Sequence, residues 1–230
     1  MHIFKKVLLV HISKGIATKA KMQFLAFTAI LVGVLHWSYS CQIYDRGVSA
    51  ADKKVILQTH NELRAKIANG KERGFPTAAN MLEMEWDDNL ANQAQAWADQ
   101  CTYAHNKPID RDGGPAGQNM AGSSGSNTKP EWKEMIESFY SEVKLYNPNN
   151  IHKYAWDEKT GHFSQVIWAK TSRIGCGYVR YVGDQYDYDF LYVCNYAPAA
   201  NWDGEPVYEV GRPCSKCGGC GSIQGLCEAN

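Results

Sequence analysis

The chain beyond residue 40 contains four histidines, and imidazole is the side chain that most readily acts as a base or a metal ligand near neutral pH. His60 lies on the apolar face of a predicted helix and is interpreted as a core residue, whereas His152 lies in a polar stretch and is expected to be exposed. His105 follows a predicted helix, and His162 begins another. If the fold brings these two together with Glu142, two imidazoles and a carboxylate could hold a divalent cation with open coordination positions.

A hydrolytic alternative uses the same region of the chain. Ser164 lies two residues after His162 and would be the nucleophile of a secreted protease that also uses Glu142. The sequence contains neither a G-x-S-x-G elbow nor an H-E-x-x-H motif, so no local pattern indicates how the serine or a metal would be activated. The protease is therefore the less favoured hypothesis, and we expect a protein that is not an enzyme.

Charge is distributed unevenly along the 230 residues. Residues 1–40 contain five lysines and no acidic residue, and the remainder carries 19 basic against 24 acidic residues, a net charge of −5. A mildly acidic body offers no electrostatic reason to bind nucleic acid or an anionic membrane surface. Nucleic acid is therefore excluded as an expected partner.

The first 40 residues have the order of a secretory signal peptide. A basic lead is followed by an apolar stretch at residues 24–35 and then by small residues, and the apolar stretch is too short to span a bilayer. Met22 stands where a signal peptide would begin, so residues 1–21 are interpreted as an upstream extension. We expect a secreted, extracellular protein that does not span the membrane after signal removal; an N-terminal anchor helix is the alternative.

All eight cysteines lie at or after residue 41, and an even number downstream of a secretion signal is typical of disulfides. The tail contains a C-x-x-C-x-x-C run and, after six intervening residues, a fourth cysteine, a spacing that could hold zinc or an iron–sulfur cluster. An oxidising compartment favours disulfides over metal at these positions.

Hydrophobic periodicity predicts four helices followed by a pair of strands. The helices are expected at residues 50–69, 87–103, 131–146 and 162–169. The strands are expected at residues 174–182 and 189–197, joined by a polar turn around residues 183–184. Segments 111–129 and 183–189 are interpreted as loops. Helices followed by a hairpin favour an α+β fold in which the helices pack on a small antiparallel sheet.

Short motifs occur in a fixed order along the chain: HNELR (60–64), WADQCTYAHN (97–106), GQNMA (117–121), GHFSQVIW (161–168) and CNYAPAANW (194–202). This ordered set resembles the CAP superfamily of cysteine-rich secretory proteins, antigen 5 venom allergens and plant pathogenesis-related proteins. It is most similar to venom-allergen-like members from invertebrates. The resemblance implies an α–β–α sandwich with a small, mainly antiparallel sheet between helices, a CAP domain over residues 41–203 and a short disulfide-rich, hinge-like tail over residues 204–230.

The resemblance also implies a surface cleft lined by two histidines and two acidic side chains. The matching positions are His105, Gln118, Glu142 and His162. Gln118 stands where many members of the family have glutamate, and an amide is neither a general base nor a good zinc ligand. We therefore expect weak Zn²⁺ binding by His105 and His162, with no cofactor required.

Four disulfides follow from the resemblance. They are Cys41–Cys101, Cys176–Cys194, Cys214–Cys220 and Cys217–Cys227. The hairpin alone already makes a cross-strand bond between Cys176 and Cys194 reasonable. The function that the resemblance implies is non-enzymatic binding, either of a sterol or fatty acid or of a host or prey protein.

Overall fold

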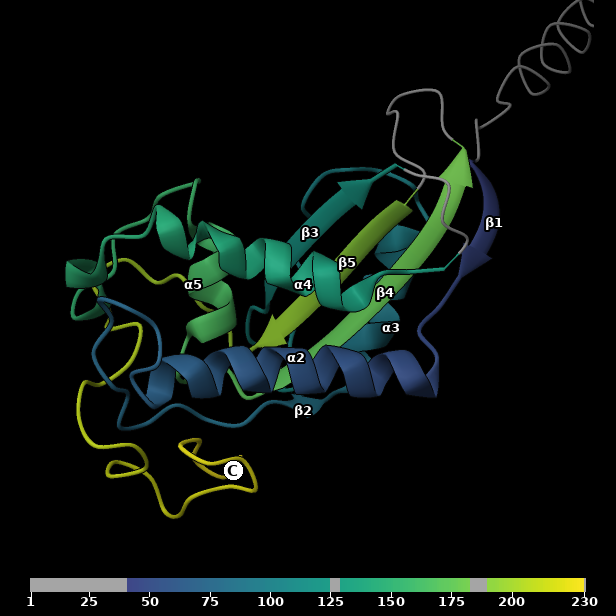
Figure 1. Ribbon diagram of the computed structural model, residues 1–230. Coiled ribbons are helices and arrows are strands. Elements are labelled where there is room, and N and C mark those ends of the chain that lie inside the picture. The colour runs from purple at the N-terminus through teal and green to yellow at the C-terminus, as the bar shows by residue number, and fades with distance from the viewer. Residues whose placement is uncertain (1–40, 125–128, 183–189, 230) are drawn as a thin grey trace, which may run out of the picture. The chain divides into compact units, whose positions relative to one another are not determined.

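The computed structural model describes residues 41–124, 129–182 and 190–229, and Figure 1 shows how their helices and strands are arranged. The chain divides into two units, Met1–Ser40 and Cys41–Asn230, and the fold described below is that of the second unit. The expected signal peptide, the loop at 183–189 and the turn at 183–184 lie outside the described residues. Within the described residues, no helix is both long and apolar enough to cross a bilayer.

A five-stranded sheet forms the centre of the unit. Its main path runs β1-β4-β5-β3, with neighbouring strands antiparallel, and the short β2 pairs in parallel with β4. The strands are β1 (Gln42–Arg46), β2 (Glu85–Trp86), β3 (Gly117–Ser123), β4 (Arg173–Val182) and β5 (Phe190–Ala197). The mixed α+β class and the expected β4–β5 pairing are confirmed.

The expectation of a loop at residues 111–129 is wrong for its middle part. Residues 117–123 form β3, which pairs with β5 over its whole length, from Gly117 opposite Tyr196 to Ser123 opposite Phe190. Two glycines and small polar residues give this segment little intrinsic preference for a strand. Pairing along β5 outweighs that preference, because strand formation depends more on neighbours than on the segment itself.

The helices begin within one residue of the predicted positions, and two of them end well before the predicted residue. They are α2 (Ala50–Ala68), α3 (Asp88–Ala98), α4 (Trp132–Ser141) and α5 (Gly161–Ile167), with short 3₁₀ turns η1 (Glu142–Lys144) and η2 (Pro148–Ile151). Asp87 caps α3 by accepting the N–H groups of Asn89 and Leu90. At the other end of α3, Cys101 has a φ of +51°, which no α-helix tolerates in its interior.

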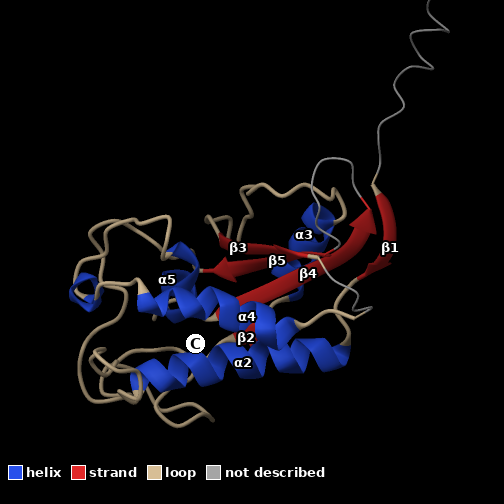
Figure 2. Cartoon of the chain, turned by 45° about the horizontal axis from the view of Figure 1, so that its top comes forward, coloured by secondary structure: helices blue, strands red, loops and turns tan. Residues whose placement is uncertain are grey.

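The sheet lies between two helical layers, as Figure 2 shows, with α3 on one face and α2, α4 and α5 on the other. Alternation along the central strands supplies both cores. On β5, Tyr192 and Cys194 belong to the larger core under α2, α4 and α5, whereas Leu191 and Val193 belong to the smaller core under α3. The α–β–α sandwich is therefore confirmed.

Helix α3 lies very close to the sheet because two positions of β4 have no side chain. A Cβ atom on Gly175 would lie 2.1 Å from the backbone nitrogen of Ala91, and one on Gly177 would lie 2.3 Å from that of Gln95. Backbone atoms cannot move aside as a flexible side chain can. The glycines in the stretch Ile174–Gly177 therefore set the distance between α3 and the sheet.

Three residues of the HNELR motif, His60, Asn61 and Arg64, are buried and structural. Arg64 is fully buried and donates hydrogen bonds to five backbone carbonyls: those of Leu82, Val166, Trp168, Ala169 and Thr171. Burial lowers the pKa of Arg64 to about 9. Asn61 exchanges two hydrogen bonds with the backbone of Met84. These side chains join α2 to the segments before β2 and after α5.

His60 is the core histidine that the sequence predicts. It is fully buried, with Nδ1 2.8 Å from the carbonyl oxygen of Ile56 and Nε2 3.0 Å from the hydroxyl of Tyr196. The carbonyl can only accept, so Nδ1 carries the proton and Nε2 accepts from the tyrosine. Burial lowers the pKa of His60 to about 4. The ring is therefore neutral at physiological pH.

Three of the four expected disulfides are present: Cys41–Cys101, Cys176–Cys194 and Cys217–Cys227. The expected Cys214–Cys220 bond is not formed, since both residues are free thiols. The Cys214 thiol instead donates to the carbonyl of Leu226 at 3.3 Å. Burial, followed by a hydrogen bond with Cys220, raises the pKa of Cys214 to about 11.

The tail packs on the segment that leads from α2 to β2. The N–H of Cys227 donates to the carbonyl of Met81, and the N–H of Glu83 donates to the carbonyl of Cys227, both at 2.8 Å. The carboxylate of Glu83 accepts both the N–H and the hydroxyl of Ser222. Leu226 is fully buried. The tail is thus held in place by backbone pairing and by a small apolar contact.

Candidate functional site

Glu142 lies at the end of α4, where the helix tightens into η1. Its side chain connects α4 to α5. One carboxylate oxygen lies 2.7 Å from Nδ1 of His162, and the other accepts the N–H of Phe163 at 3.0 Å. The residue before α5, Thr160, supplies no side-chain cap. Glu142 therefore both orients the imidazole and caps α5 from another element, where a negative charge is favourable.

His162 is fixed on three sides. Its ring stacks on Phe139 of α4 with the ring centroids 4.9 Å apart, and its backbone carbonyl accepts the side-chain amide of Asn119 of β3. Because Glu142 is an acceptor, the proton lies on Nδ1. Within the described parts of the chain, Nε2 of His162 has no hydrogen-bond partner, and 31% of the side chain is exposed.

His105 is oriented by an amide network rather than by a carboxylate. Its Nδ1 lies 3.0 Å from Oε1 of Gln118, which also accepts the N–H of Asn106. The other end of the Gln118 amide donates to the side-chain oxygens of Asn106 and Asn195. Oε1 is thereby defined as the acceptor, so the neutral tautomer of His105 that fits this bond has its proton on Nδ1 and leaves Nε2 as the acceptor atom.

Strand β3 stands between the two histidines. Successive side chains of a strand point to opposite faces, so Gln118 lies with His105 on the α3 side and Asn119 lies with His162 on the α4–α5 side. The structure therefore arranges the four expected cleft residues as two pairs, His105–Gln118 and His162–Glu142, that are linked through one strand.

These residues do not form a closed set of metal ligands. Across the described residues, the one group of three or more histidine, cysteine or acidic side chains whose ligand atoms lie within 4.8 Å of one another is Cys214, Cys217 and Cys227. A cation at the cleft would bind to imidazole nitrogens alone, with its remaining positions open.

Ser164 is not placed as a nucleophile. It is fully buried, and its hydroxyl lies 2.7 Å from the side-chain oxygen of Asn201 and 3.1 Å from the carbonyl of Thr160. None of its hydrogen bonds involves an imidazole. The hydroxyl holds the turn at residue 201 against the start of α5, and this geometry gives the protease hypothesis no support.

Sequence reasoning did not identify the amides that support the site. Asn106, Asn119 and Asn195 each bond to a cleft residue, and all three lie inside the quoted motifs, next to or opposite a cleft residue. Only Asn195 lies in a predicted strand, where asparagine is unusual, and this is the available signal. His152 is exposed, as expected, and lies outside the site.

Comparison with known proteins agrees with this geometry. The profile of the cysteine-rich secretory protein family, CAP, matches residues 57–196. The chain is 41% identical over 184 residues to venom allergen 5 of Tityus serrulatus. The aligned region covers 77% of this chain and 44% of that protein. The chain thus spans less than half the length of that relative.

Two solved structures share the fold. BmVAL-1 superposes with a TM-score of 0.67 at 29% identity, covering 80% of this chain and 96% of its own. A crystal structure of NaASP2 with Zn²⁺ gives a TM-score of 0.64 at 28% identity, covering 80% of this chain and 99% of its own. The profile match, the venom-allergen relative and the shared sandwich lead to one conclusion: the chain belongs to the CAP family of cysteine-rich secretory proteins, among its venom-allergen-like members.

Proposed function

We propose that this chain is a secreted, non-enzymatic CAP protein that acts by binding, and that its cleft holds a divalent cation such as Zn²⁺ weakly. The single observation that supports the metal is the orientation of the two imidazoles. Nδ1 of His162 is bonded to Glu142 and Nδ1 of His105 to Gln118, which leaves Nε2 of each ring as the coordinating atom. Histidine ligands of metals generally have this second hydrogen bond.

The donor set explains why the binding is weak. Catalytic zinc sites usually have three protein ligands, and this cleft offers two. Both oxygens of Glu142 are already bonded to His162 and Phe163, and Gln118 is an amide. The cation would act as a Lewis acid whose open positions take water or a ligand atom. The related NaASP2 structure with Zn²⁺ supports the choice of metal.

A sterol or fatty acid is the proposed small ligand, and a host or prey protein is the alternative partner. The support is membership of the family and a net charge of −5 beyond residue 40, which disfavours nucleic acid. Native mass spectrometry of the secreted protein would detect a co-purified lipid. A lipid-free protein that also fails to take up added sterol or fatty acid would exclude the carrier role and leave the protein partner.

Calorimetric titration with Zn²⁺ tests the metal. We expect one weak site, and we expect the double variant His105→Ala/His162→Ala to abolish it. His152→Ala is the matched control, because His152 is exposed and lies outside the cleft. Equal affinity in the wild type and the double variant would disprove the assignment.

The absence of enzymatic function is tested separately. We expect the purified wild type and the Ser164→Ala variant to show the same peptidase background, because the Ser164 hydroxyl is buried and bonded to Asn201. An activity that copurifies with the wild type and disappears only in the Ser164→Ala variant would contradict a pure binding function.

A further inference from the structure

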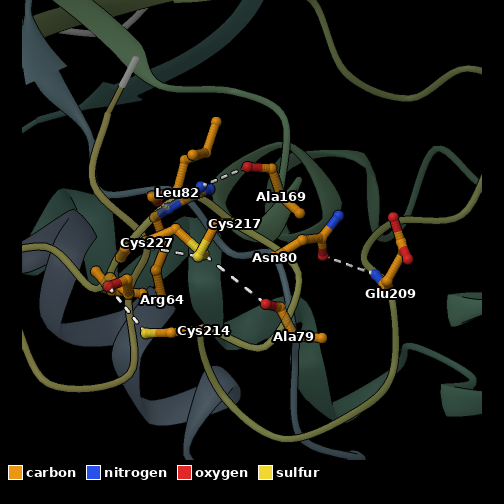
Figure 3. Close-up of a disulfide and its surroundings, with 11 residues drawn as sticks. Arg64, Ala79, Asn80, Leu82, Ala169, Glu209, Cys214, Cys217 and Cys227 are labelled. Atoms are coloured by element: carbon orange, nitrogen blue, oxygen red, sulfur yellow. Dashed lines mark hydrogen bonds between the residues drawn. A yellow bond between two sulfur atoms is a disulfide. The ribbon is translucent and has the colours of Figure 1, made fainter.

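The four cysteines of the tail form one group, which we call the tail sulfur cluster: Cys214, Cys217, Cys220 and Cys227. The sulfur atoms of Cys214, Cys217 and Cys227 all lie within 4.8 Å of one another. Cys220 lies outside this three-sulfur group, but its backbone pairs with Cys227 across a short antiparallel bridge, and its thiol contributes to the raised pKa of Cys214. The cluster contains one disulfide and two free thiols, and Figure 3 shows the sulfur of Cys214 beside the Cys217–Cys227 bond.

The backbone holds this cluster together independently of its sulfur chemistry. The N–H of Gly221 donates to the carbonyl of Leu226 at 2.8 Å, and the N–H of Glu228 donates to that of Gly219 at 3.1 Å. This turn keeps Cys220 opposite Cys227. The bonds of Cys227 and Glu83 described above fix the turn to the body. None of these backbone bonds involves a sulfur atom, so reduction of the Cys217–Cys227 bond removes none of them.

We propose that, once the Cys217–Cys227 bond is reduced, the tail sulfur cluster binds one thiophilic cation such as Zn²⁺ through its four cysteine sulfurs. Four sulfurs at about 2.3 Å from a tetrahedral zinc ion lie roughly 3.8 Å apart. The sulfurs of Cys214, Cys217 and Cys227 already lie within 4.8 Å of one another, so small shifts would bring them to that spacing. Thiolates prefer zinc and other soft cations, whereas the histidines of the cleft form a separate nitrogen site.

Disulfide and metal exclude each other at this site. A dithiol reductant opens the Cys217–Cys227 bond through a mixed disulfide, supplies two electrons and becomes a disulfide itself. The four cysteine thiols release their protons to solvent as they bind the cation. Return of the cluster to a disulfide transfers two electrons from two of the sulfurs to a disulfide acceptor, and the cation leaves. The oxidised extracellular protein therefore has a stapled tail, and the reduced chain has a metal site.

Titration of the reduced full chain with Co²⁺ tests this proposal, because thiolate ligation produces intense charge-transfer absorption. We expect one Co²⁺ per chain in the reduced wild type and none of this absorption in the oxidised protein. Cys220→Ser should weaken binding by more than about 100-fold, since losing a ligand costs more than losing an outer-shell contact. Cys220→His should retain binding. His105→Ala/His162→Ala is the matched control and should leave the absorption unchanged.

A second measurement does not depend on how the reduced protein folds. Alkylation of the reduced chain with and without Zn²⁺, followed by peptide mass mapping, reports each cysteine. We expect Zn²⁺ to protect the four tail cysteines and to leave Cys41 and Cys101 reactive. Equal labelling of tail and body cysteines in the presence of Zn²⁺ overturns the proposal, as does an identical Co²⁺ spectrum for Cys220→Ser and Cys220→His.

Discussion

Two sets of histidines in this protein differ in how their ring nitrogens are used. His60 is buried, and both of its nitrogens are bonded, to Ile56 and to Tyr196. His105 and His162 each have Nδ1 bonded and Nε2 without a hydrogen-bond partner among the residues that the structure describes. A histidine with both nitrogens engaged is part of the frame, whereas one with a single nitrogen fixed is oriented to bind something else.

The same contrast separates the HNELR motif from the polar side chains around His105 and His162. In HNELR, Arg64 uses its donors on backbone carbonyls and Asn61 on Met84. Around the cleft, the polar side chains of Glu142, Gln118 and Asn119 bond to the histidines or their backbone. Motif recognition alone does not distinguish these roles. Substitutions in both regions would test this distinction.

The largest effect is expected at Arg64. Arg64→Ala would remove the guanidinium donor from five backbone carbonyls, of which those of Trp168 and Ala169 would keep a backbone N–H donor. The other three would be left unsatisfied at about 1–3 kcal/mol each, so we expect a loss of roughly 5 kcal/mol or more in the free energy of unfolding. Urea unfolding measures it. Glu62→Ala, in the same motif but exposed, should change stability by less than about 0.5 kcal/mol. Similar losses for the two variants would show that the buried network is not what stabilises the motif.

His60 should make stability depend on pH. Its pKa is lowered from 6.5 to about 4 in the folded protein, so between these values the unfolded chain binds a proton that the folded chain does not. The contribution of His60 to the free energy of unfolding is fully present above pH 6.5. It should fall by about 3 kcal/mol as the pH drops toward 4. Comparing urea midpoints at several pH values for the wild type and His60→Gln measures the slope. His152→Gln should retain it, and an unchanged slope in His60→Gln would contradict the assignment.

Glu142→Gln should weaken Zn²⁺ binding without removing a ligand. His162 would lose its charged hydrogen-bond acceptor, and such outer-shell losses typically cost 10–100-fold in affinity, so we expect about that loss. Calorimetric titration measures it. The exposed Glu137→Gln, on the same helix, is the control and should bind as the wild type does. Unchanged affinity in Glu142→Gln would show that the pair with His162 is purely structural.

Gln118→Glu should have the smallest effect and the opposite direction. A carboxylate would still accept the protons of His105 Nδ1 and the Asn106 N–H, and its charge would make the imidazole more basic. We expect Zn²⁺ affinity to rise about tenfold. Gln100→Glu, an exposed substitution of the same charge, should leave it unchanged. Equal tightening by both variants would mean that overall charge, not the cleft geometry, controls affinity.

The sequence predicted the large elements because their signals are local. The apolar stripe of α2, the Asp87 cap of α3 and the run of tyrosine and valine in β4 are all read from neighbouring residues. Strand β3 was missed because its pairing with β5 depends on residues 67 to 79 positions away. The early end of α4 was missed because Glu142, which is polar, leaves the helix to bond to α5.

The cleft residues were identified from motif order, and their roles needed the coordinates. No local pattern shows that Glu142 contacts His162 while Gln118 contacts His105. The tail behaved in the same way. Its spacing predicted bonded cysteines, and the Cys217–Cys227 bond is present, but spacing does not show that Cys214 is a free thiol that donates to the carbonyl of Leu226.

The position of the two imidazoles on opposite sides of β3 has a mechanical consequence. A cation that binds both Nε2 atoms would connect the α3 layer to the α4–α5 layer around the edge of the sheet, so it would act as a clasp across the sandwich. Binding energy would then oppose opening of β3 from β5, by an amount that grows with the ratio of free cation to dissociation constant. Slower hydrogen exchange of the β3 amides would register occupancy of the cleft, even when no ligand signal can be observed directly.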